Sequence, residues 1–285
     1  MKRKNVVAAG HKATAEAARE LLWLGGNAFD AAVGAVFTAM IAESGLTSAG
    51  GAGYLMAAPV GAPPVVYDFF AEMPRADVGD ELDFFAVDVD FGYATQEFHV
   101  GKASAGVPGN IAGLLQVQEE LGQLSLVDVL APSVRTASQG LEITEHQAQF
   151  LEILRPILTY SKAGRELYAP SGELLKEGDT FRMSEFSGFL RELGQEGSEF
   201  FYHGEPAGII TEWSQGQGGL LTAADFEQYR VVKRKPLCTA FAGYEVYLNP
   251  PPAQSGILID VTLSLLEKEH CRRSRSVPLA DLVTA

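Results

Sequence analysis

The sequence predicts an α+β fold, and three observations support this class. Residues 12–42 carry two helical patterns separated by glycines, and residues 54–70 carry two apolar runs separated by a Gly/Pro turn. Further along, a strand pair over residues 238–248 precedes an apolar helical stretch over residues 257–269. No internal repeat, low-complexity block or linker divides the sequence, so we expect one domain covering residues 1–285.

The first helix is predicted over residues 12–24, because apolar residues recur at helical spacing at positions 13, 17, 21 and 24. Gly25-Gly26 is a plausible stop, since glycine accepts the left-handed conformation that ends many helices. Asn27 or Asp30 then begins a second helix over residues 28–42. That stretch is apolar on all sides, which predicts a buried helix. Taken alone, the glycine joint is more typical of an ordinary helix–turn–helix than of a functional motif.

The apolar runs 54–58 and 65–70 predict a buried β-hairpin. Gly50, Gly51 and Gly53 precede them. A phosphate-binding loop fits this cluster poorly, because no GxxxxGK[ST] motif follows and the next element is a strand. We therefore expect these glycines to allow close backbone packing.

The rest of the chain is predicted to be mainly helical. Residues 71–100 are acidic and mixed in character, which predicts a loop-rich excursion. Further elements are expected as helices over residues 111–121, 126–139, 145–159, 184–193, 223–229 and 257–269, and as a strand pair over 238–248. The basic run at residues 231–236 is interpreted as a solvated turn before a strand.

Composition excludes several classes of function. The 285 residues carry a net charge of −14, whereas a nucleic-acid-binding protein needs a basic surface for phosphates. The same charge disfavours anionic membrane surfaces, and no apolar run reaches the ~18 residues of a spanning helix. The first residues turn polar too early for a signal peptide, so we expect a cytoplasmic protein.

Side chains that bind metals or carry out catalysis form no recognisable pattern. The five histidines show no HExxH or HxH spacing, and the two cysteines are too few for a disulfide framework. His99 is expected to pack as a neutral, hydrogen-bonded side chain. Asp88 and Asp90 are interpreted as solvated loop charges rather than a glycosidase pair. We therefore expect no metal and no cofactor.

Four segments in a fixed order carry a family resemblance. They are residues 10–55 with GGNAFDAA and SAGGAGYL, 103–140 with GVPGN, 201–237 with LLTAADFEQY, and 243–267 with NPPPAQSG. In this order they resemble the gamma-glutamyltransferase family, also called the gamma-glutamyltranspeptidases. The resemblance implies an N-terminal-nucleophile hydrolase fold, which is a four-layer αββα sandwich. It further implies that this chain is the large-subunit portion of that sandwich, which is incomplete without the small subunit.

The resemblance also implies a mechanism. Family proenzymes cleave themselves into a large and a small subunit, and the new N-terminal threonine of the small subunit attacks the γ-glutamyl amide. Its own α-amine serves as the base, and backbone N–H groups hold the oxyanion. All four segments correspond to the large subunit, so we expect the nucleophile to lie beyond Ala285 and no catalytic residue to lie within the chain. The partner implied is a small-subunit polypeptide, without which the isolated chain is expected to be marginally stable or to aggregate.

The substrate site departs from the family pattern. The family's large subunit supplies an arginine after the strand equivalent to residues 65–69, which pairs with the substrate α-carboxylate. Here that position is Phe70, and the next arginine is Arg75. Arg75 either reaches the same space or is solvated, and the solvated state is favoured. Gly50, Gly51 and Gly53 are expected to pack beside core strands near the active site.

Three functions remain open at this point. The first is a gamma-glutamyltransferase or glutathione hydrolase acting on γ-glutamyl amides. Phe70 favours a second, an acylase or amide hydrolase acting on other acyl amides. The third is a non-catalytic subunit that depends on a separate partner.

Overall fold

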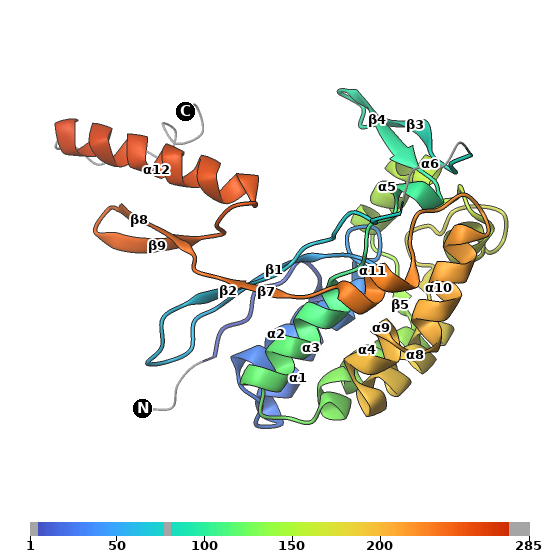
Figure 1. Cartoon of the computed structure of the whole chain (residues 1–285), viewed down its shortest axis with the longest axis horizontal. Coiled ribbons are helices and arrows are strands. Elements are labelled where there is room, and N and C mark those ends of the chain that lie inside the picture. The colour runs from blue at the N-terminus through green and yellow to red at the C-terminus, as the bar shows by residue number, and fades with distance from the viewer. Residues whose placement is uncertain (1–4, 77–80, 274–285) are drawn as a thin grey trace. The chain divides into compact units, whose positions relative to one another are not determined.

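A computed structural model of the chain describes residues 5–76 and 81–273, with the side chains of 269–273 left undescribed. The chain forms two compact units (Figure 1). The first comprises the described residues up to Gly53 and Phe69–Arg230, and the second comprises Tyr54–Asp68 and the described residues from Val231. Each unit is described by itself. The single domain expected over residues 1–285 stays a prediction.

The first unit is mostly helical. Its helices are α1 Lys12–Trp23, α2 Ala28–Ala42, α3 Asn110–Leu121, α4 Leu126–Gln139, α5 Glu145–Ile153, α6 Arg155–Leu158, α7 Lys162–Tyr168, α8 Ser184–Glu196, α9 Ser198–Tyr202, α10 Glu205–Gln215 and α11 Ala223–Gln228. A short 3-10 helix covers Lys102–Ser104. Two antiparallel pairs accompany them, β3 Phe85–Asp90 with β4 Thr95–Val100, and β5 Leu141–Glu142 with β6 Thr180–Phe181.

The core of this unit lies where α1, α2 and α4 pack together. Phe37 of α2 is fully buried, as are Leu21 of α1 and Leu130 of α4. Small residues permit the close crossing: a Cβ on Gly34 would lie 2.2 Å from Leu21 Cδ1. The predicted buried helix over residues 28–42 is therefore confirmed, with the predicted boundaries.

Asp30 joins the start of α2 to the turn between α3 and α4. Asn27 and Asp30 cap the helix reciprocally, in the pattern of a capping box. The Asp30 carboxylate also accepts hydrogen bonds from Gln118 Nε2 at 2.8 Å and from the backbone N–H groups of Gln123 and Leu124. Burial disfavours the charged form of this carboxyl, but these hydrogen bonds outweigh it and lower the pKa of Asp30.

The second unit contains a three-stranded sheet in the order β1, β2, β7, a β8–β9 hairpin and helix α12. The strands are β1 Gly53–Ala57, β2 Val65–Phe69, β7 Val232–Arg234, β8 Leu237–Phe241 and β9 Tyr244–Leu248, and α12 covers Gln254–Arg273. The adjacent strands predicted from residues 54–70 are confirmed, as is the strand pair around Gly243.

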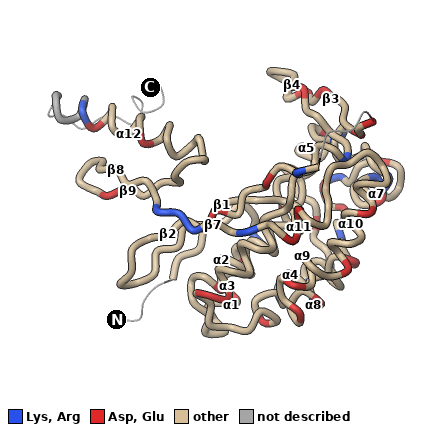
Figure 2. The backbone as a smooth tube through the Cα atoms, viewed as in Figure 1, with Lys and Arg blue, Asp and Glu red and all other residues tan. Residues whose placement is uncertain are grey.

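Residues 232–234 of the basic run 231–236 form strand β7, which corrects the interpretation of the run as a solvated turn. It pairs with β2 in antiparallel register, with Val66 opposite Arg234 (the run is blue beside the β7 label in Figure 2). Arg234 Nε donates to buried Asp68 Oδ2 at 2.6 Å. Lys233 Nζ lies 5.4 Å from the centre of the Tyr67 ring. The charges are accommodated within the sheet because β2 supplies a carboxylate and an aromatic face.

Residues 71–100 also differ from their prediction, because β3 and β4 form a regular hairpin there rather than a loop. Asp83 anchors its base: Oδ2 accepts from Lys102 Nζ at 2.9 Å and from Tyr160 Oη at 2.8 Å. The hydrogen bonds from Lys102 are the main cause that lowers the pKa of Asp83 to about 2. His99, expected to be packed, is exposed on β4 and stacks on Phe84.

One further correction concerns the helix predicted over residues 145–159. It is two helices, α5 and α6, with a break at Leu154. Pro156 lies at the start of α6, and proline is tolerated there because the first helical N–H groups have no partner within the helix. No helix among residues 5–76 and 81–273 is both long and apolar enough to cross a bilayer.

Candidate functional site

Phe70 lies where the chain leaves β2, and Arg75 follows it in the same segment. Phe69, the last strand residue, is buried, whereas the Phe70 side chain is 55% exposed. The backbone of Phe70 is fixed, because its carbonyl accepts a hydrogen bond from Tyr229 Oη at 2.9 Å. The position where the resemblance leads us to expect an arginine therefore presents an exposed aromatic ring on a held backbone.

Tyr229 is itself held by an aromatic cluster. Its ring stacks on Tyr202, with centroids 5.7 Å apart and an interplanar angle of 11°. Tyr202 Oη donates to the Pro108 carbonyl at 2.6 Å and accepts from the Ala112 N–H at 3.3 Å. Burial raises the pKa of Tyr202, so this phenol stays neutral and retains the proton that it donates. The cluster thus ties the end of β2 to the start of α3.

The glycine cluster lies against the same end of α3. The Gly51 carbonyl accepts hydrogen bonds from the N–H groups of Gly109 and Asn110, each at 3.0 Å. A Cβ on Gly51 would lie 2.8 Å from Asn110 Nδ2, and one on Gly53 would lie 3.2 Å from the Phe69 ring. Gly50 has more room, since its nearest atom would be 3.8 Å away. The geometry therefore supports close packing at Gly51 and Gly53 more than at Gly50.

Arg75 points to α11. Its backbone N–H donates to Asp225 Oδ1 at 3.0 Å, and its guanidinium donates to the side-chain carbonyl of Gln228. The same guanidinium lies 3.7 Å from the Glu72 carboxylate. Arg75 is thus partly solvated and partly engaged by its neighbours, with its side chain 59% exposed.

The segment 222–229 therefore contacts both Phe70 and Arg75. The sequence analysis did not predict this contact. Asp225 pairs with Thr222 in a capping box at the start of α11. The pattern T-x-x-D before an apolar residue predicts that cap. Tyr229 carries no such signal, because its bond reaches a carbonyl 159 positions earlier in the chain.

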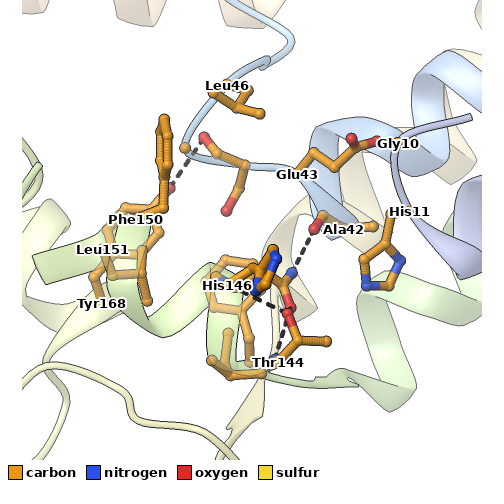
Figure 3. Close-up of a pocket in the computed structure, with 15 residues that line it drawn as sticks. Gly10, His11, Ala42, Glu43, Leu46, Thr144, His146, Phe150, Leu151 and Tyr168 are labelled. Carbon is orange, nitrogen blue, oxygen red and sulfur yellow. Dashed lines mark hydrogen bonds between the residues drawn. The ribbon is translucent and has the colours of Figure 1, made fainter. Parts of the chain in front are cut away.

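A separate pocket of about 200 Å³ lies between the start of α1, the end of α2 and α5 (Figure 3). Its polar groups are engaged in structural contacts. His11 Nδ1 accepts from the Ala13 N–H and caps α1, and Glu43 accepts from the Thr14 hydroxyl at 3.1 Å. Gln147 caps α5 and donates to the Ala42 carbonyl at 2.6 Å.

The two histidines of this pocket, His11 and His146, belong to no metal site. Within the described residues, no three His, Cys, Asp or Glu side chains are grouped to hold a metal ion. The pocket offers hydrogen-bonding groups and apolar walls.

Comparison with solved structures defines the class of the fold. The crystal structure of Helicobacter pylori gamma-glutamyltranspeptidase matches with a TM-score of 0.82 and 25% identity, over 94% of this chain and 76% of that chain. The Bacillus anthracis transpeptidase enzyme CapD has the same fold, with a TM-score of 0.77 over 96% of this chain and 85% of that one. The fold is therefore that of the N-terminal-nucleophile hydrolases, as predicted.

The sequence comparison then specifies the family. The family model described as gamma-glutamyltranspeptidase matches residues 14–279, so the chain belongs to the gamma-glutamyltranspeptidase family. The glutathione hydrolase proenzyme of Bacillus subtilis (strain 168) is 28% identical over 269 residues, 92% of this chain and 44% of that protein. The acylase ACY 1 proenzyme of Pseudomonas sp. (strain V22) is 27% identical over 93% of this chain and 48% of that protein. The chain thus spans less than half the length of these relatives.

Proposed function

We propose that the chain is the large-subunit portion of an enzyme that cleaves γ-glutamyl amides. The observation that carries this proposal is the family match over residues 14–279. The nucleophile in this proposal is the N-terminal threonine of a small subunit, released when a proenzyme is processed. Its amine takes the hydroxyl proton as the oxygen attacks the amide carbonyl, and it passes that proton to the substrate amine, which leaves an acyl ester on the threonine. Water or an acceptor amine then attacks the ester and frees the threonine hydroxyl.

The surface of α12 supports the proposed small-subunit partner. Five apolar side chains of this helix are between 41% and 61% exposed: Ile257, Leu258, Ile259, Val261 and Leu265. An apolar patch of this kind is typical of a surface that another polypeptide covers. We propose that the small subunit covers α12 and completes the sandwich.

Phe70 favours a second candidate, hydrolysis of acyl amides that lack the glutamyl α-carboxylate. Guanidinium binds carboxylate through two parallel hydrogen bonds, which a phenyl ring cannot provide. The contacts of Arg75 support this candidate, because its guanidinium donates to Gln228 and lies near the Glu72 carboxylate. An exposed ring at this position fits an apolar acyl group better, and an acylase is among the similar proteins.

The experiment begins with the protein purified from its own source. Intact mass and a denaturing gel test the processing: two chains, one of them beginning with threonine, are expected. A single species with the mass of this chain would contradict the two-subunit proposal and leave a partner-dependent, non-catalytic subunit.

The substrate is tested on that protein with γ-glutamyl-p-nitroanilide and a straight-chain acyl anilide. Preference for the γ-glutamyl compound is expected from the first candidate, and the reverse preference from the second. Phe70→Arg should shift kcat/KM towards the γ-glutamyl compound by about tenfold or more, as expected for one charge-assisted pair of 1.5–3 kcal/mol. Phe70→Leu is the matched control, because it changes shape without adding charge. Equal ratios for the two variants would contradict a carboxylate site at position 70.

A further inference from the structure

An aromatic groove runs along α8, α9 and α10 in the first unit, with a volume of about 700 Å³. Phe189 is central to its floor: it stacks on Phe186 with centroids 5.6 Å apart and lies 5.6 Å from Phe200. Trp213 and Ile209 of α10 line it with side chains that are 49% and 58% exposed. The volume lies within the range of about 300–1,000 Å³ that is usual for small-molecule sites.

The charges that line the groove have one sign. Glu185 and Glu192 of α8 and Glu205 of α10 contribute carboxylates, and all three residues are exposed. Within the described residues, no Lys, Arg or His is among those that line the groove. Beside its tryptophan, Lys102 Nζ lies 5.1 Å from the Trp213 ring centre. Lys102 is neutralised by Asp83, with 2.9 Å between Nζ and Oδ2.

Two physical effects then favour the same ligand. Aromatic faces carry negative charge density and attract organic cations, and carboxylates at the mouth of an apolar groove add a longer-range attraction. The Lys102–Trp213 contact shows that this indole already accepts a cation on one face. An anion would meet three carboxylates, and a strongly hydrated inorganic cation would gain nothing from the phenyl floor.

We propose that this groove binds an organic ammonium ion with an aromatic or alkyl body. The body packs on Phe186, Phe189 and Phe200, and the ammonium group faces Glu185, Glu192 and Glu205. This site is distinct from the pocket of Figure 3, with which it shares no lining residue. It does not depend on the proposed function, because it requires no nucleophile and no small subunit.

The groove contains its own reporter. The sequence has two tryptophans, Trp23 and Trp213, and only Trp213 lines the groove. In a Trp23→Phe background, the fluorescence of Trp213 is titrated with phenylpropylamine, phenylpropanol and phenylpropanoic acid at pH 7. These probes share one body and differ in charge. The amine is expected to bind at least tenfold more tightly than the alcohol, and the acid more weakly than either. Calorimetry on the unsubstituted protein provides a second readout that does not rely on the indole.

Variants of the three glutamates then test whether their charges bind the ammonium group. Replacing Glu185, Glu192 and Glu205 together by glutamine should weaken binding of the amine at least tenfold and leave that of the alcohol within twofold. Glu196→Gln is the matched control, because Glu196 is an exposed glutamate of the same helix that does not line the groove.

Equal affinity for all three probes, or no heat and no fluorescence change with the amine, would overturn the proposal. Binding to this chain that is lost in the two-subunit protein would also overturn it, since the groove would then be an internal interface. If the triple variant and the Glu196→Gln control lost the same affinity for the amine, the effect would come from the net charge of the protein and not from the groove. That result would also overturn the proposal.

Discussion

Helices α2 and α12 both contain apolar side chains, but the surroundings of these side chains are opposite. Nine of the 15 residues of α2 are buried, including Phe37 and Met40, whose side chains are at most 1% exposed. In α12, Leu258 and Leu265 are 59% and 61% exposed within the described part of the chain. An apolar sequence therefore predicts that a helix face is buried. It does not predict which segment or which polypeptide covers that face. For α2 the cover comes from α1, α3 and α4, whereas α12 packs against β8 and β9 and leaves a second face uncovered.

The largest effect is expected from truncating the buried helix. Phe37→Ala should lower the free energy of unfolding by about 3–5 kcal/mol, because it removes a fully buried ring and leaves a cavity. Leu258→Ala on α12 should change it by less than about 0.5 kcal/mol. Urea denaturation of the two variants measures both values. Equal losses would break the comparison, since Leu258 would then be buried in solution.

The polar anchor of α2 should have an intermediate effect. Asp30→Asn removes the charge that five hydrogen bonds stabilise and should cost about 1–3 kcal/mol. Since the pKa of Asp30 is lowered in the folded state, its contribution is complete above the ordinary aspartate pKa of about 3.9 and is lost as pH falls through the lowered value. Urea denaturation at pH 7 and at pH 3 tests this. A variant as stable as the parent at pH 7 would contradict it.

The smaller polar anchor is Asp83, at the base of the β3–β4 hairpin. Its folded pKa of about 2 means that its contribution is present above the unfolded value near 3.9 and disappears between about pH 4 and pH 2. Because the carboxylate is 22% exposed and screened by solvent, Asp83→Asn should cost only about 1 kcal/mol at pH 7. Amide hydrogen exchange over residues 85–100 should show faster opening of the hairpin. If the exchange rates over residues 85–100 were unchanged, Asp83 would not stabilise the hairpin.

The smallest change in unfolding free energy is expected on the exposed face of α12. Leu258→Glu with Leu265→Glu should alter it by less than about 0.5 kcal/mol, yet reduce self-association, because charge replaces an exposed apolar patch. Val6→Glu with Val60→Glu is the matched control, since both valines are almost fully exposed and lie outside α12. Sedimentation velocity compares the two pairs. If the two double variants self-associated to the same extent, the exposed face of α12 would not be the surface that mediates self-association.

Much of the fold could be predicted because local signals mark its elements. Asn27 and Ser125 cap α2 and α4, and Gly140 follows α4 with a φ of 85°, so both helices have their predicted ends. The β3–β4 hairpin was missed because its acidic, exposed residues resemble a loop, although Val87 and Val89 alternate with Asp88 and Asp90. The acidic composition of this segment predicts a loop, whereas the alternation of apolar and acidic residues predicts a strand. The alternation was the more informative of the two signals.

The candidate site was less predictable, because it depends on contacts between distant segments. The family resemblance singled out Phe70 as a candidate, but it did not indicate the tyrosine that holds its carbonyl. β7 was missed for the same reason: Arg234 becomes acceptable in a strand only when Asp68 lies beside it. Neither residue of such a pair carries a sequence signal that predicts its partner.

The hydrogen bond from Tyr229 to the carbonyl of Phe70 has a consequence for how this protein can change. It holds position 70 through an atom that every amino acid possesses, while the Phe70 side chain is largely outside the packing. The placement of the backbone is thereby separated from the chemistry displayed on it. Under the proposed function, a substitution at position 70 would therefore change the contact offered to the substrate, while the hydrogen bond that holds the backbone is kept.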